Sequence, residues 1–458
     1  MKMGDDGAGS RTAKTVSSDR QDDLSIALPE EAKRMCLQPV YMRRFVCDGS
    51  RCGSLCCCAK WGVAFDAATL ARYEARPKLL QELQNGLEKS EETGGWIMRH
   101  ENGRCVFLCE DGLCSLQRRF GIGAISDVCA EYPRKMHEIG DTLDLALCLS
   151  CPVAAEEVLF AEEPPAFEWV ELAAPRPAYV DRAPLGAPLS AGAFRALQLA
   201  GLALLSERSL SLDTRLAALG LLLARAESYV EEGAAEALAK DVAAIAEAAA
   251  KEAATLLSTN PFGAAQYMDF FVRLFPALAE KTADDLPETA ALLRRIGEVF
   301  GDAANGWTDV AAFLQRRRRY AERILAKHGS VLEHWLLNEF LLGRYPLTGG
   351  TSLLANYEVF VVLYKMLEFL LLAGEALDDE GAAPKETARR PGCGTGGAVS
   401  AKPPRRRPVA RRAHEPLRRI HRRLGGRDRA SLARGSPAQA ARWRSMTKPR
   451  RDGARRGF

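Results

Sequence analysis

The second half of the chain has a helical pattern of hydrophobic and polar positions. Between residues 210 and 233, apolar residues recur on one helix face, with Asp213 as the expected N-cap and Gly233 as the expected end. The alanine-rich stretch 235–257 favours another helix because alanine has the highest helix propensity. Similar patterns predict helices at 266–278, 286–301, 307–329, 331–345 and 357–376. We therefore expect residues 191–376 to form an all-α domain.

The most apolar of these stretches is 357–376. It contains Glu358, Lys365 and Glu368, and charges are costly in the middle of a bilayer. A buried amphipathic helix is the better interpretation, so we expect no membrane partner. The polar N-terminus has no apolar core of the kind that a secretory signal needs. These features predict a cytoplasmic protein whose thiols stay reduced.

The first part of the chain lacks helical periodicity. Residues 1–35 are polar and rich in Gly, Ser and Asp, which predicts a disordered N-terminus. Residues 36–155 have short apolar runs separated by Gly, Asp and Asn, and residues 156–190 contain several prolines typical of a connector. The predicted fold class is therefore mainly α. A small irregular cysteine-rich metal or cluster domain (36–155) precedes the all-α domain.

Composition adds a division of charge. Hydrophobic residues make up 47% and charged residues 27%, which excludes collagen-like, wholly disordered and polytopic membrane proteins. The chain has a net charge of +4, but residues 385–458 carry a net +19, which leaves −15 on the preceding residues. The stretch 377–458 therefore predicts a basic, low-complexity, disordered tail. A shift of reading frame near residue 377 would produce the same pattern. Nucleic-acid binding is not expected, because only this tail has the positive charge that binding to phosphates needs.

Twelve of the 13 cysteines lie between Cys36 and Cys151. Most fall into three groups: Cys47, Cys52 and Cys56–Cys58; Cys105, Cys109 and Cys114; and Cys129, Cys148 and Cys151. In a reducing compartment, such density indicates metal binding rather than disulfides. Thiolates suit zinc and iron–sulfur clusters. Because four ligands complete one zinc or one cubane cluster, twelve cysteines predict either two sites or some cysteines that bind no metal.

These residues resemble the flagellin lysine-N-methylase family, part of a wider group of zinc- or iron-chelating cysteine-cluster proteins. The resemblance covers about residues 38–376, and it is weaker in the helical half. It is carried by the pattern F-x-C-x-G-S-x-C-x3-C-C from Phe45, by Trp61, Asp66, Thr69 and Tyr73, by Cys105, Asp111–Cys114 and Cys129, and by the Tyr132-Pro133-Arg134 and Ser150-Cys151-Pro152 triplets.

The resemblance implies methylation of lysine ε-amino groups on flagellin, with S-adenosylmethionine as donor and a bound iron–sulfur cluster of the 4Fe-4S type, or zinc. The family has one adjacent cysteine pair where this chain has three cysteines, so the pair is either Cys56–Cys57 or Cys57–Cys58. Cys109 and Cys148 stand where the family has other residues. The implied metal ligands are Cys47, Cys52, Cys56, Cys57, Cys105, Cys114, Cys129 and Cys151.

Lysine methylation sets its own chemical demands. The substrate is an ammonium with a pKa of about 10.4, so it must lose a proton before its nitrogen can attack. Acidic and aromatic residues beside the cysteines are the candidates for this site: Asp66, Tyr73, Glu131 and Tyr132. Each also has a structural interpretation, as a helix cap for Asp66 and as packed aromatic rings for the tyrosines. The acidic body would attract a lysine-rich substrate.

A protein of another class fits the same cysteines. A non-enzymatic zinc- or iron-binding protein would need the thiols and nothing further. No glycine fingerprint follows a predicted strand, so the usual nucleotide-binding fold is not predicted. The pattern carries no prediction of the oligomeric state.

Overall fold

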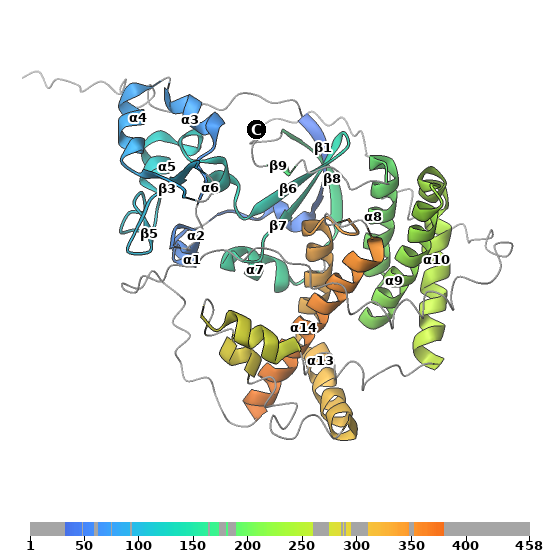
Figure 1. Cartoon of the computed structure of the whole chain (residues 1–458). Coiled ribbons are helices and arrows are strands. Elements are labelled where there is room, and N and C mark those ends of the chain that lie inside the picture. The colour runs from blue at the N-terminus through green and yellow to red at the C-terminus, as the bar shows by residue number, and fades with distance from the viewer. Residues whose placement is uncertain are drawn as a thin grey trace, which may run out of the picture. The chain divides into compact units, whose positions relative to one another are not determined.

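The computed structural model describes residues 33–47, 49–58, 63–74, 76–91, 94–163, 165–173, 180–181, 189–259, 274–284, 287, 290–294, 310–347 and 352–379. These residues belong to two compact units, each with its own core (Figure 1). The first unit holds residues 57–130. The second holds the described residues from 33 to 56 and those after position 130. The predicted N-terminal disorder and basic tail lie outside the described residues.

Short helices and hairpins around a small apolar core make up the first unit. Tyr73, Leu83 and Phe120 are buried at its centre. Its helices are α3 (Ala67–Glu74), α4 (Pro77–Gln84), α5 (Ser115–Phe120), the 3-10 turn η4 (Ile122–Ala124) and α6 (Asp127–Glu131), whose last residue is already in the second unit. Its strands are β2 (Leu87–Lys89) and β3 (Trp96–Met98), which pair with each other, and β4 (His100–Glu101) and β5 (Arg104–Cys105), which form a second hairpin.

A five-stranded mixed sheet forms one layer of the second unit. Its strand order is β8-β1-β7-β6-β9, from β1 (Lys33–Pro39), β6 (Arg134–Ile139), β7 (Thr142–Leu147), β8 (Phe167–Ala173) and β9 (Val180–Asp181). Strand β1 runs parallel to β7 with Cys36 opposite Leu143, and antiparallel to β8. Strands β6 and β7 form an antiparallel hairpin. The sheet thus joins segments more than 100 residues apart.

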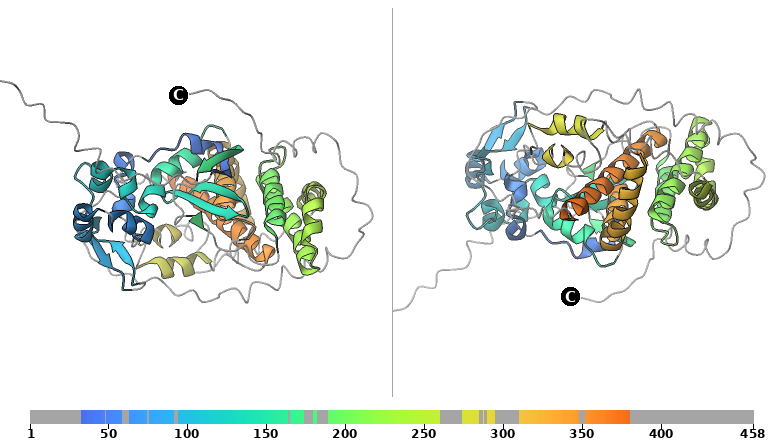
Figure 2. Two further views of the ribbon diagram at one scale, coloured as in Figure 1. Left: turned by 90° about the horizontal axis from the view of Figure 1, so that it is seen from above. Right: turned by 90° about the horizontal axis from the view of Figure 1, so that it is seen from below.

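Helices pack on this sheet and on one another (Figures 1 and 2). Helix α7 (Pro152–Leu159) packs with β6 and β7 in a smaller core. The larger core is formed by α8 (Ala191–Leu205), α9 (Leu212–Glu231), α10 (Ala235–Thr259), α13 (Val310–Leu342) and α14 (Leu353–Asp379). Leu37 and Ala146 of the sheet share this core with Phe194 of α8 and Phe340 of α13. The prediction of a mainly α protein is confirmed. None of the described helices is both long and apolar enough to cross a membrane.

Buried polar groups fix α8 on the sheet and α13 against α9. Asp144 of β7 accepts hydrogen bonds from Arg195 and, at 2.8 Å, from Gln198 of α8. Glu333 of α13 likewise accepts from Arg215 at 2.7 Å and from Arg208 at 2.8 Å. Each buried carboxylate is therefore paired, as the cost of burying a charge requires.

The structure differs from the predicted organisation at three points. Residues 36–155 do not form one cysteine-rich domain, because they supply β1, β6 and β7 to the sheet and the remaining residues to the first unit. The predicted connector 156–190 contains β8, which pairs with β1 along its whole length. The N-cap of α9 is Ser211, and Asp213 instead pairs with Lys365 at 2.8 Å. The end at Gly233 is confirmed, with φ at +70°.

Two buried histidines predict a stability that depends on pH. Burial lowers the pKa of both His137 and His334, and their rings hydrogen-bond the carbonyls of Leu342 at 2.8 Å and Leu159 at 3.2 Å. At these two histidines the unfolded chain binds more protons than the folded one, so their contribution to stability should be lost as the pH falls below the ordinary value of about 6.5. Urea unfolding at about pH 7.5 and pH 5 measures this loss.

The variant His334→Asn should show a smaller loss of stability between these two pH values. The matched control is Ile324→Val on the same helix, where Ile324 is buried. It should lose about 0.5–1.5 kcal/mol at both pH values and keep the wild-type pH dependence. An unchanged pH dependence in His334→Asn contradicts the prediction.

Candidate functional site

Parallel pairing of β1 with β7 brings two cysteine segments together. Because parallel neighbours end at the same edge of a sheet, the residues that follow β1 and those that follow β7 lie close to each other. Cys47, Cys52 and Cys56 follow β1, and Cys151 follows β7. Cys52 ends α1 (Gly49–Cys52), Cys56 lies in α2 (Leu55–Cys58), and Cys151 is the N-cap residue of α7. We refer to these four residues as the thiol group.

Local contacts hold the thiol group in place. Gly53 and Ser54 have φ values of 63° and 59°, so the chain turns sharply between α1 and α2. Arg51 of α1 makes an ion pair with Glu156 of α7 at 3.0 Å. Figure 1 shows α1 beside α7.

The four thiols act on one another electrostatically. Desolvation raises the pKa of Cys47 to about 11, with further contributions from Cys56, Cys151 and Cys52. Burial also raises the pKa of Cys151, although the backbone N–H groups of Ala154 and Val153 oppose that rise. Several thiolates so close together need a positive partner, which is what a metal ion supplies. The donor chemistry therefore fits zinc or an iron–sulfur cluster.

The four cysteines of the thiol group are neighbours, but their side chains do not form a closed coordination shell. In the described part of the chain, no three Cys, His, Asp or Glu side chains converge as a metal site requires. The cysteines of the group are reduced thiols. Metal binding here would therefore draw the side chains together.

Tyr132 lies near two members of the thiol group, Cys56 and Cys151. Its hydroxyl is 3.0 Å from the hydroxyl of Ser150. Burial raises the pKa of Tyr132 to about 12; the Ser150 hydrogen bond opposes the rise, and nearby Cys151, Cys56 and Cys148 add to it. Its neighbour Glu131 is buried at the end of α6.

The other four predicted ligands belong to the first unit: Cys57, Cys105, Cys114 and Cys129. Cys105 ends strand β5 and Cys114 precedes α5, and both pack against the apolar core of that unit. Cys109 lies in the turn between them, where its N–H donates to the carbonyl of Leu113 at 2.9 Å. The eight predicted ligands are therefore divided between two units, and four of them form the thiol group.

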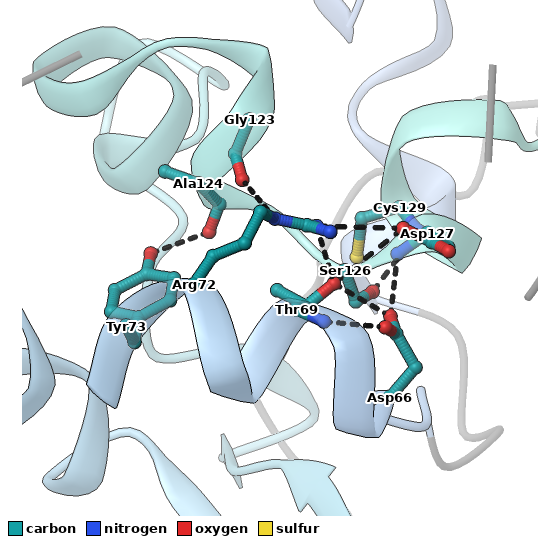
Figure 3. A network of polar contacts seen from close by, with 9 residues as sticks. All are labelled: Asp66, Thr69, Arg72, Tyr73, Gly123, Ala124, Ser126, Asp127 and Cys129. Carbon is teal, nitrogen blue, oxygen red and sulfur yellow. Dashed lines mark hydrogen bonds and ion pairs between the residues drawn. The ribbon is translucent and has the colours of Figure 1, made fainter. Parts of the chain in front are cut away.

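Asp66 and Tyr73 belong to a polar network within the first unit (Figure 3). Asp66 accepts hydrogen bonds from the N–H and the hydroxyl of Thr69, both at 2.7 Å, and from the N–H of Asp127 at 3.0 Å. Burial opposes ionisation, yet these hydrogen bonds hold the pKa of Asp66 below its usual value. Asp66 thus caps α3, the structural role that was its alternative interpretation.

The rest of this network joins α3 to the segment that carries Cys129. Arg72 contacts Asp127 at 3.5 Å and donates to the carbonyl of Gly123 at 3.3 Å. The hydroxyl of Tyr73 donates to the carbonyl of Ala124, and Tyr73 is completely buried. The N–H of Cys129 donates to the Ser126 hydroxyl at 3.2 Å, so the network fixes the start of α6 (Figure 3).

Comparison with known proteins agrees with the family resemblance. Residues 199–386 match the model of the FliB lysine N-methylase C-terminal domain. The chain is also 30% identical to the flagellar biosynthetic protein FliU of Salmonella muenchen over 128 residues. This match covers 27% of the chain and 75% of FliU. The chain belongs to the flagellin lysine-N-methylase family.

Two further members of this family match over 128 residues at the same 30% identity. They are the Lysine-N-methylases of Salmonella typhimurium strain LT2 and Salmonella choleraesuis strain SC-B67. In both cases the match covers 32% of the relative's length, so the chain spans about a third of these relatives. No solved structure is significantly similar to the chain.

Sequence reasoning missed two polar residues that lie near the end of β7. Asn338 of α13 donates to the carbonyl of Leu147 at 3.2 Å and accepts from the hydroxyl of Tyr41. Its neighbour Glu339 lies near Cys148 and Lys135, and burial raises its pKa to about 7 although Lys135 opposes the rise. Both lie inside a helical pattern, where polar residues are ordinarily assigned to the solvent face. Only the tertiary structure reveals their contacts.

The polar network predicts that Asp66 stabilises the first unit without taking part in chemistry. Asp66→Ala removes the cap of α3 and should cost roughly 0.5–2 kcal/mol, seen as faster hydrogen exchange in α3 and α6. The control Asp66→Asn keeps an oxygen that accepts from Thr69, so its exchange should be closer to wild type. If α3 exchanges as fast in Asp66→Asn as in Asp66→Ala, the assignment is wrong.

Proposed function

We propose that this protein transfers methyl groups from S-adenosylmethionine to lysine ε-amino groups of flagellin. The observation that carries the proposal is the 30% identity to proteins named Lysine-N-methylase and FliU. The acidic body of the chain supports it, because a net charge of −15 attracts a lysine-rich surface.

The thiol group is the proposed metal centre of this activity. Cys47, Cys52, Cys56 and Cys151 would hold an iron–sulfur cluster or zinc, because they are four soft donors in one neighbourhood. The bound group would supply the positive charge that lets these thiols ionise. Reduced thiols of this kind suit the cytoplasm, where we place the reaction.

The residues beside the thiol group have roles that follow from their contacts. Tyr132 and Ser150 form a hydroxyl pair that can hydrogen-bond a substrate, and Glu131 adds a carboxylate nearby. Methyl transfer is mainly a task of aligning nitrogen, methyl carbon and sulfur, so such positioning groups matter more than covalent chemistry.

Co-expression with flagellin tests the activity. The mass spectrum of flagellin should shift by whole methyl increments that map to lysine residues. A chain lacking residues 380–458 should methylate equally, because the proposed centre lies outside the basic tail. If flagellin stays unmodified although the co-expressed protein contains its metal, the proposed methylase activity is wrong. That result favours a metal-binding protein without enzymatic activity.

Loss of a single thiol tests the metal centre. Cys151→Ala removes a proposed direct ligand of the metal. Loss of a residue that only hydrogen-bonds a ligand typically lowers metal affinity roughly 10–100-fold, so the affinity for iron or zinc should fall by at least this factor. Cys36→Ala is the matched control, since Cys36 is buried in β1 outside the thiol group. Elemental analysis of the purified variants measures the difference. Equal metal content in both variants would falsify the proposed centre.

A further inference from the structure

Glu339 is a partly buried carboxylate held at the same sheet edge as the thiol group. The hydrogen bond from Asn338 to the carbonyl of Leu147 fixes α13 against the end of β7. The next residue along each segment is Glu339 on α13 and Cys148 after β7, and the two lie close enough to interact electrostatically. Among the described residues, the Glu339 carboxylate makes no hydrogen bond or ion pair. A carboxylate in such surroundings is ordinarily paired.

Among the described residues, three charged or ionisable groups interact with this carboxylate. They are Lys135 on β6, Cys148 after β7 and Tyr345 after α13. Burial raises the pKa of Glu339 to about 7, and Lys135 limits that rise. The carboxylate can therefore both accept and release a proton near neutral pH, as a general base must.

Cys148 links Glu339 to the proposed metal centre. Cys148 and Cys151 are both neighbours of Tyr132. The N–H of Cys151 donates to the carbonyl of Cys148 at 3.3 Å, so one short turn carries both residues. Glu339, Tyr132 and the thiol group thus share one corner of the second unit.

We propose that Glu339 is the general base that removes the proton from the substrate lysine. The inference rests on the proposed methylase function. One N–H bond of the ammonium breaks and its proton passes to a carboxylate oxygen of Glu339. The freed lone pair attacks the methyl carbon of the sulfonium donor, a nitrogen–carbon bond forms, and the carbon–sulfur bond breaks to leave a neutral thioether. The proton then passes from Glu339 to solvent.

Methylation rates of three variants test the proposal. Purified protein with its bound metal, purified flagellin and S-adenosylmethionine are followed by mass spectrometry between about pH 6 and pH 9. Glu339→Gln should lower the rate by about 10²–10⁴-fold, and Glu339→Asp should retain part of it. The matched control Glu322→Gln changes a mostly exposed glutamate on the same helix and should keep the wild-type rate.

The pH profile and the stability separate this role from a structural one. The wild-type rate should rise through a titration near pH 7, and this rise should disappear in Glu339→Gln. A glutamate with a raised pKa destabilises the folded state as the pH increases through that pKa. Glu339→Gln should therefore melt at or above the wild-type temperature at about pH 8 while losing activity.

The experiment distinguishes a failure of the proposed methylase function from a failure of the proposed role of Glu339. Wild-type protein that leaves flagellin unmethylated overturns the methylase itself. Active wild type with an equally active Glu339→Gln overturns only the role of Glu339. If Glu339→Gln does not fold, a wild-type rate that is constant between about pH 6 and pH 8.5 overturns the proposal by itself.

Discussion

The parallel ladder between β1 and β7 is the interaction on which the rest of the second unit depends. It joins Cys36 to Leu143 and Leu37 to Asp144, across a separation of more than 100 residues. Between these strands the chain leaves to form the first unit and then returns. Without this pairing, the cysteines that follow β1 would have no reason to meet the cysteine that follows β7. The thiol group therefore depends on the parallel pairing of β1 with β7.

Asp144, which lies in the same ladder, also attaches a helix to the sheet. Its carboxylate lies in the buried sheet and accepts hydrogen bonds from Arg195 and Gln198, which fixes α8 over β7. At the end of the same strand, the carbonyl of Leu147 accepts from Asn338 of α13. Two helices are thus attached to β7 by directional bonds, whereas apolar packing alone would allow them to slide. This attachment gives Glu339 a defined position beside Cys148.

Helical segments and their ends were predictable because they depend on local sequence. The repeat of apolar positions predicted α9, and Gly233 marked its end because glycine readily adopts the left-handed conformation found there. The cap was less predictable, since Ser211 and Asp213 are both good N-cap residues and only the contact with Lys365 places Asp213 in the first turn. Strands β1 and β8 were missed, because each is seven residues long and is stabilised by a distant partner.

The sequence by itself determined three features of this protein: a dense set of cysteines, an acidic body and a helical second half. These are properties of composition and local periodicity, and no folding is needed to state them. Only the tertiary structure decided which cysteines become neighbours, that Asp66 caps a helix, and that Glu339 lies near Cys148. The reason is physical, because proximity between distant segments is set by strand pairing and helix packing, and these depend on the whole chain.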